Sequence, residues 1–177
     1  MTKTALLVID AQVGLIQGSR GPVHNSKNLV ERIQFLLSRA REVNLPVIYI
    51  QDDDVAPVHS EEWQIHDSIK PEANEVVLRK KSTDAFHGTE LYDELSSRGI
   101  TQLVVVGCKT EYCVDSTCRR ATTLGFNVIL VGDGHSTTDN KVLKAEQIIA
   151  HHNCNLHGLD NLENYIEVRS SDDISFS

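Results

Sequence analysis

Short apolar runs rich in β-branched residues alternate along the chain with segments of helical periodicity. Nearly continuous apolar runs of this length are typical of parallel strands that are buried on both faces of a sheet. Six such runs are predicted to be strands: TALLVID (4–10), PVIYIQ (46–51), EVVLRK (75–80), QLVVVG (102–107), NVILVG (127–132) and NYIEV (164–168).

The segments between these runs predict covering helices. Residues 26–44 carry an apolar stripe at helical spacing, formed by Leu29, Val30, Ile33, Leu36, Leu37 and Ala40. Further helices are expected over 90–99 and 110–125, which both end in glycine, and over 141–153. Strands that alternate with helices indicate βαβ crossovers. We therefore predict an α/β fold of three layers, α/β/α and Rossmann-like, with a six-stranded, mostly parallel sheet.

Length and charge narrow the function. A chain of 177 residues predicts one domain, residues 1–177. The net charge of −8 argues against nucleic acid or a membrane surface as the partner, so we expect a small-molecule substrate. No apolar stretch approaches the roughly 20 residues of a membrane-spanning helix, and the N-terminus shows no secretory signal. A cytoplasmic location is expected.

Polar residues follow three of the predicted strands. Asp10 ends the first strand, Lys80 ends the third, and the fourth leads through Lys109 into the helix that contains Cys113. Because ligands of open parallel sheets bind beyond the carboxyl ends of the strands, an acid, a cation and a thiol are expected at one edge. Taken singly, Asp10 is equally suited to capping a loop, and Lys80 to a solvated strand exit.

Cys113 is the best candidate for a nucleophile among four cysteines that do not form a disulfide framework. It is predicted to lie in the first turn of a helix, where unpaired N–H groups and the helix dipole favour an anion. A lysine nearby also lowers the pKa of a thiol, so a reactive thiolate is expected. Cys118 is turned roughly 140° away around the helix axis, and Cys108 and Cys154 are expected to act as small hydrophobic residues.

Three segments carry a resemblance to a known family: LLVIDAQ (6–12), KKSTDAFHGTEL (80–91) and GCKTEYCVDSTCRRATTLGFNVILVGDGHST (107–137). The chain resembles the isochorismatase-like cysteine hydrolases, which include nicotinamidases and N-carbamoylsarcosine amidohydrolases. The resemblance implies a catalytic triad of Asp10, Lys80 and Cys113. It also implies a cis peptide bond between Cys108 and Lys109, with the backbone N–H groups of Lys109 and Cys113 forming an oxyanion hole.

The implied reaction is hydrolysis of the C–N bond of a small amide through a thioester on Cys113, by a homodimer or higher homo-oligomer. A nicotinamidase is the alternative within the family. Alternatives of other classes are a small-molecule binding protein without catalysis, and a thiol redox sensor that pairs Cys113 with Cys108 or Cys118.

The chain departs from the nicotinamidases at a metal motif. They place Asp-x-His after the second strand, where this chain has three consecutive aspartates, Asp52 to Asp54. We therefore expect no cofactor. A metal ion bound by Asp52 or Asp54 together with His59 or His66 is the alternative.

Four residues are candidates for contacts with the substrate. Trp63, Phe86 and Tyr112 are predicted to form an aromatic wall against a flat substrate, and Gln12 to donate or accept a hydrogen bond. Trp63 is equally suited to anchoring a lid or a dimer contact. His135, at the end of the fifth strand, is either another site residue or a structural one.

Overall fold

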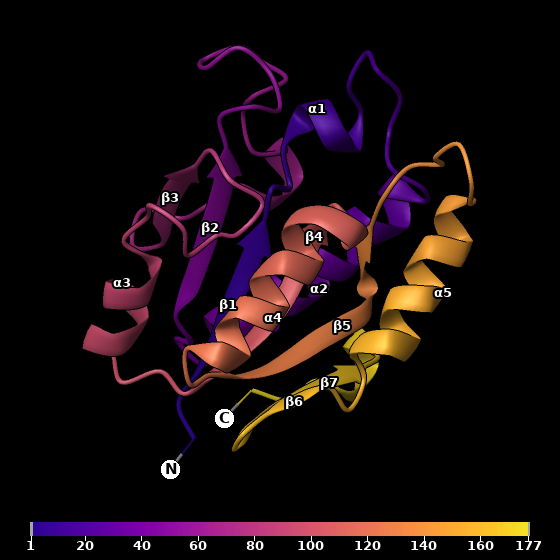
Figure 1. Cartoon of the computed structure of the whole chain (residues 1–177). Helices are drawn as coiled ribbons and strands as arrows, with labels where there is room; N and C mark the ends of the chain where they lie inside the picture. Colours follow the sequence, from indigo (N-terminus) through magenta and orange to yellow (C-terminus); the bar gives the residue numbers. More distant parts are fainter. Residues whose placement is uncertain (1, 177) are drawn as a thin grey trace.

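The computed structural model, which describes residues 2–176, contains one seven-stranded sheet of order β3-β2-β1-β4-β5-β7-β6 (Figure 1). All six predicted strands are present, as β1 (Thr4–Ile9), β2 (Val47–Asp52), β3 (Val76–Lys80), β4 (Gln102–Cys108), β5 (Asn127–Ser136) and β7 (Asn164–Arg169). They pair in parallel. The predicted number of strands was one too low, because β6 (Asp160–Asn161) has only two polar residues and no apolar pattern. It pairs antiparallel with β7 at the sheet edge.

The helices cover both faces of the sheet, which confirms the three layers. They are α1 (Val13–Ile16), α2 (Ser26–Glu42), α3 (Leu91–Ser97), α4 (Asp115–Thr123) and α5 (Ala145–Leu156). α2 lies behind the sheet in Figure 1, whereas α3, α4 and α5 lie in front. The last helix begins later than predicted, because residues 141–144 form a loop that precedes its first turn. In the described residues, no helix combines the length and hydrophobicity that crossing a bilayer requires.

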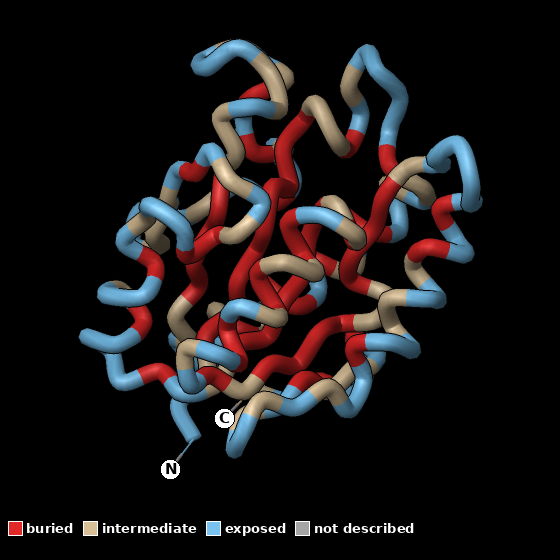
Figure 2. The backbone as a smooth tube through the Cα atoms, in the orientation of Figure 1, coloured by how far each residue is buried: buried red, intermediate tan, exposed pale blue. Residues whose placement is uncertain are grey.

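Each face of the sheet packs against its helices through a separate apolar core. Ala5, Leu7 and Ile9 face the layer of α3, α4 and α5, whereas Leu6 and Val8 face α2. Every residue from Ala5 to Ile9 has no solvent-exposed surface, and the strands form the buried centre of Figure 2. This explains why the strands are apolar throughout rather than alternating.

The chain reverses its direction across the sheet between β1 and β4. From β1 it proceeds to β2 and β3 on one side, and later from β4 to β5 on the other side. Such a reversal leaves a crevice at the carboxyl ends of the two central strands, where ligands of α/β proteins bind.

Gly107 allows these two strands to approach closely at the crevice. Its φ is 125°, and a Cβ atom built there would lie 1.9 Å from the backbone oxygen of Ile9. No side chain fits that space, so only glycine can occupy position 107. The backbone of Ile9, the residue before Asp10, imposes this requirement.

Candidate active site

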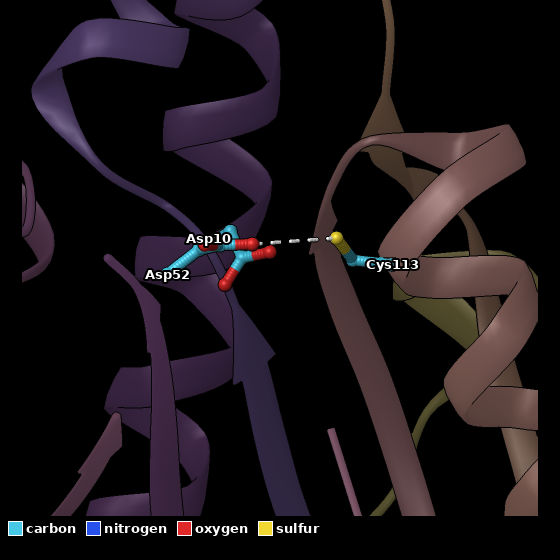
Figure 3. A group of neighbouring side chains, drawn as sticks. All are labelled: Asp10, Asp52 and Cys113. Carbon is cyan, nitrogen blue, oxygen red and sulfur yellow. Dashed lines mark hydrogen bonds between the residues drawn. The ribbon is translucent and has the colours of Figure 1, made fainter. Parts of the chain in front are cut away.

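Four side chains from different elements meet at the carboxyl edge of the sheet. Asp10 follows β1, Asp52 ends β2, Lys80 ends β3, and Cys113 lies in the turn between β4 and α4. The Lys80 Nζ atom lies 2.9 Å from Oδ2 of Asp10 and 3.2 Å from Sγ of Cys113, and it also bonds Oδ2 of Asp52. Figure 3 shows Asp10 and Asp52 on one side of the site and Cys113 opposite them. The structure therefore brings together Asp10, Lys80 and Cys113, and it adds Asp52.

The cluster is shielded from water to different degrees. The side chain of Lys80 has no exposed surface and that of Asp10 has 1%, whereas that of Asp52 has 13%. Asp10 has a positive φ of 47°, a conformation that aspartate tolerates better than most residues. Lys80 binds one oxygen of Asp10, and the other oxygen, Oδ1, has no hydrogen-bond partner among residues 2–176. One oxygen of this buried carboxylate is thus free, in a cluster where ligand atoms of Asp10, Asp52 and Cys113 lie within 4.8 Å of one another.

The charges of the cluster set its protonation. Burial raises the pKa of Asp10 to about 7, although the ammonium group of Lys80 opposes this rise. Burial acts to lower the pKa of Lys80, but its ion pair with Asp10 and its other anionic neighbours outweigh burial and raise it. Burial and the charge of Asp10 raise the pKa of the Cys113 thiol to about 12. Lys80 is therefore a cation and Cys113 a neutral thiol at neutral pH.

This finding contradicts the lowered thiol pKa that the sequence position of Cys113 predicted. Cys113 does not lie at the open start of an α-helix but in a π-helical turn, Thr110–Val114, that precedes α4. The residue is 8% exposed. Loss of hydration and a nearby carboxylate disfavour the thiolate more than Lys80 favours it.

Hydrogen bonds to the neighbouring elements hold the turn that carries Cys113. The Cys108–Lys109 peptide bond is cis, and the Lys109 oxygen accepts from the backbone N–H groups of Tyr112 and Val114, each at 3.2 Å. Thr110 is fully buried, and its Oγ1 atom lies 2.9 Å from Nδ1 of His135.

His135 links this turn to α5 in one defined tautomer. Its Nε2 atom lies 2.8 Å from Oδ1 of Asn153, whose Nδ2 group donates to the Gly132 oxygen. Because Oδ1 of Asn153 can only accept, Nε2 of His135 carries the proton and Nδ1 accepts from the Thr110 hydroxyl. Burial lowers the pKa of His135 to about 4, so the ring stays neutral. The sequence left open whether His135 is a site residue or a structural one. In the structure it holds the turn through Thr110.

A cavity of about 590 Å³ opens above the cluster. Asp10, Asp52 and Cys113 line it, together with the half-exposed ring of Tyr112. Its other lining residues are Gly14, Leu15, Arg20, Gly21, Asp54, Val55, Glu62, Lys81, Ser82, Thr83, Lys109, Thr138 and Asp139. Both signs of charge occur on these walls, and the cavity has room for a small substrate.

Three predicted substrate contacts do not line this cavity. The amide of Gln12 is fully buried, where Nε2 donates to the backbone oxygens of Asp52 and Trp63 and Oε1 accepts from the Asp52 N–H. The indole N–H of Trp63 donates to Asp53, and the guanidinium of Arg79 covers the ring at 5.2 Å. Phe86 stacks on Phe126 in the core. The predicted aromatic wall is therefore wrong except for Tyr112.

The predicted alternative metal ligands are also apart from each other. His59 packs edge-on against Trp63, and Nε2 of His66 contacts Oε1 of Gln17. Among the described residues, the grouping that suits a metal is Asp10, Asp52 and Cys113, whose ligand atoms lie within 4.8 Å of one another. The ammonium of Lys80 already bonds both of these carboxylates. Because a cation occupies the position between the acids, this set does not fit a metal ion.

Comparison with known proteins agrees with this fold. Residues 4–153 match the Isochorismatase domain family. A streptothricin hydrolase of Streptomyces noursei is 36% identical over 139 residues, which cover 76% of this chain and 50% of that protein. The chain thus spans about half the length of this curated relative.

Solved structures share the architecture over nearly the whole chain. An isochorismatase from Pseudomonas putida has a TM-score of 0.87 at 25% identity, with 97% of this chain and 89% of the other covered. An N-carbamoylsarcosine amidase from Thermoplasma acidophilum shares the fold with a TM-score of 0.80 at 23% identity, with 98% and 99% covered. The chain belongs to the isochorismatase family.

Proposed function

We propose that the protein is a hydrolase that cleaves the C–N bond of a small amide through a thioester on Cys113. The observation that carries this proposal is the pairing of a buried thiol with a carboxylate that has one oxygen fixed by Lys80 and one oxygen free. Asp10 is poised to accept a proton, and its pKa of about 7 lets it return that proton.

In the first half of the reaction, the thiol proton of Cys113 moves to Asp10 as Sγ attacks the amide carbon. The C–S bond forms, and the carbonyl oxygen gains negative charge. Backbone N–H groups of Lys109 and Cys113 stabilise this oxyanion. Asp10 then gives its proton to the nitrogen, the C–N bond breaks, and ammonia or an amine leaves.

In the second half, water hydrolyses the thioester. The water oxygen attacks the acyl carbon while Asp10 accepts a proton from the water. The C–S bond then breaks, and Asp10 returns the proton to the sulfur of Cys113. The product is a carboxylic acid. Lys80 stays protonated throughout, since its charge stabilises Asp10 and the transient thiolate rather than transferring a proton.

The names of two similar proteins support hydrolysis: one is a streptothricin hydrolase, and another, alike in fold, is an amidase. The alternative nicotinamidase reading rests on a metal site, and Lys80 occupies the position where the acids of this chain would hold one. We propose that the site works without a metal ion. The redox sensor is not favoured, because burial raises the pKa of Cys108 and of Cys118, and so disfavours the thiolates that pairing with Cys113 would require.

Intact-mass spectrometry during turnover tests this proposal. Wild-type protein is mixed with a panel of small aliphatic and aromatic primary amides, and released ammonia is measured alongside the protein mass. We expect an acyl adduct that maps to Cys113 and is removed by hydroxylamine. Cys113→Ala is expected to lose activity by about 10³-fold or more, whereas the matched Cys118→Ala, also a buried cysteine, keeps it. Equal amide cleavage by Cys113→Ala would refute the thioester.

A further inference from the structure

We propose that Asp52 is a second carboxylate of the reaction, which accepts a hydrogen bond from the N–H of the departing nitrogen. The cavity would therefore select amides that carry an N–H over esters of the same acid. This inference rests on the proposed function and identifies the substrate class of that site.

Asp52 faces the reacting sulfur from the cavity side. Its Oδ2 atom lies 3.9 Å from Sγ of Cys113 and bonds Lys80. Of the two acids that bond Lys80, Asp52 has the more exposed side chain. Asp10, by contrast, is almost fully buried. Both acids line the cavity, and Oδ1 of Asp10 has no hydrogen-bond partner in residues 2–176.

The backbone of Asp52 is fixed on both sides. The amide of Gln12 donates to the Asp52 oxygen at 3.0 Å and accepts from the Asp52 N–H at 2.9 Å. The carboxylate is held as well, because its Oδ1 atom accepts from the N–H of Asp54 at 2.8 Å. Oδ2 is thereby directed toward Lys80 and the sulfur. Gln12 is thus a positioning residue for Asp52 rather than a contact to the substrate.

The arrangement around the sulfur places the leaving group beside the acids. The proposed oxyanion hole belongs to the turn that carries Cys113, whereas Asp10 and Asp52 lie on the opposite side of Sγ (Figure 3). When the carbonyl oxygen points toward the Lys109 and Cys113 N–H groups, the nitrogen points away from them. It then points toward the side of Sγ where the two carboxylates lie.

The two acids would divide the work. Asp10 donates the proton that any leaving group requires, whether nitrogen or oxygen. Asp52, a carboxylate paired with the ammonium of Lys80, can only accept hydrogen bonds. An amide N–H satisfies it, whereas the oxygen of an ester leaves it facing another acceptor. Asp52 keeps its bond to Lys80 with either substrate, so the discrimination comes from the repulsion between two acceptors that only the ester meets.

The test compares a primary amide with the methyl ester of the same acid, chosen from the panel above. We would measure kcat/KM for both in the wild type and in Asp52→Asn. The ratio of amide to ester cleavage should fall at least 10-fold in Asp52→Asn. Asp54→Asn, a neutralised acid of the same cavity wall, should keep the wild-type ratio. Gln12→Ala, which frees the Asp52 backbone, should lower the ratio as well and replaces Asp52→Asn if that variant does not fold.

The ratio of amide to ester cleavage distinguishes a direct contact of Asp52 with the leaving group from the general effect of losing a charge. If Asp52→Asn slows amide and ester equally, Asp52 acts only through Lys80 and Asp10, and the inference is wrong while the thioester mechanism stands. If Cys113→Ala cleaves both substrates as fast as the wild type, the proposed function itself fails.

Discussion

The apolar interior of the sheet and the paired charges of Asp10 and Lys80 at its carboxyl edge are both almost fully shielded from water, but they are stabilised in opposite ways. Residues Ala5 to Ile9 are fully buried and apolar, so each contributes about 25 cal/mol per Å² of surface removed from water. One residue later, Asp10 is 1% exposed and pairs its carboxyl group with the ammonium of Lys80. Burial of an ion costs several kcal/mol unless partners offset it. The interior is therefore stable residue by residue, whereas the cluster is stable only as a set.

Removal of Lys80 should break the cluster with the largest effect. Lys80→Met leaves the carboxylates of Asp10 and Asp52 without their shared cation. We expect activity to fall by about 10³-fold or more, and the free energy of unfolding at pH 7 to fall by about 3–5 kcal/mol. Because protonation removes the unpaired charges, the stability difference should shrink as the pH is lowered. Urea unfolding at several pH values measures it.

Lys81→Met is the matched control, because Lys81 is the next residue and is exposed on the cavity wall. A surface lysine of this kind should change stability by no more than about 0.5 kcal/mol. Equal losses in the two variants would show that the shared cation is not what stabilises the cluster.

Substitution of His135 should give an intermediate effect that sharpens the comparison, because it removes support from the turn without touching the charges. His135→Ala removes the partner of the Thr110 hydroxyl and of Oδ1 of Asn153, at a cost of about 1–3 kcal/mol. We expect kcat to fall about 10-fold with little change in KM, because the nucleophile is misplaced while the cavity wall remains.

His135→Gln retains a donor and an acceptor and should recover part of the lost kcat. His151→Ala, an exposed histidine on α5, should behave as the wild type. A loss of stability in His135→Ala without any change in kcat would limit His135 to a structural role.

Titration should give the smallest effect at neutral pH, and its growth in acid is diagnostic of Asp10. Asp10 must be ionised to accept the thiol proton, and its pKa is about 7. The value of kcat/KM should therefore fall about tenfold per pH unit below pH 7. Asp52→Asn should move this limb to lower pH, because the charge of Asp52 contributes to raising the pKa of Asp10.

Alkylation by iodoacetamide checks the resting state of the thiol. Because the pKa of Cys113 is raised to about 12, this residue should react slowly at pH 7, and exposed Cys154 should react first. Rapid reaction of Cys113 below pH 7 would instead indicate a preformed thiolate, as its sequence position near a helix start had suggested.

Most of the fold could be predicted because its determinants are local patterns. The apolar runs and the stripe from Leu29 to Ala40 specify strands and a helix that need no further context. β6 escaped prediction because pairing with β7, not its two polar residues, makes it a strand.

The site was only partly predictable because burial and direction are not local. Asp52, Asp53 and Asp54 are alike in the sequence, yet the structure directs the first to Lys80 and the second to Arg79. Aromatic side chains such as Trp63 and Phe86 are as common in a core as in the wall of a cavity, so the residue type alone could not show where they lie. The predicted lowering of the Cys113 pKa was wrong, because a position in the sequence does not show how far burial removes a side chain from water.

The hydrogen bonds around Gln12 have a consequence for how the substrate range of this chain could change. Asp53 is tied to Lys80 through its backbone, and the oxygen of Trp63 accepts from both Gln12 and Gln51. Between these two anchors, residues 54–62 contribute Asp54, Val55 and Glu62 to the cavity wall. Exchanging this segment for that of a relative would change this wall of the cavity, while Asp10, Lys80 and Cys113 would keep their positions.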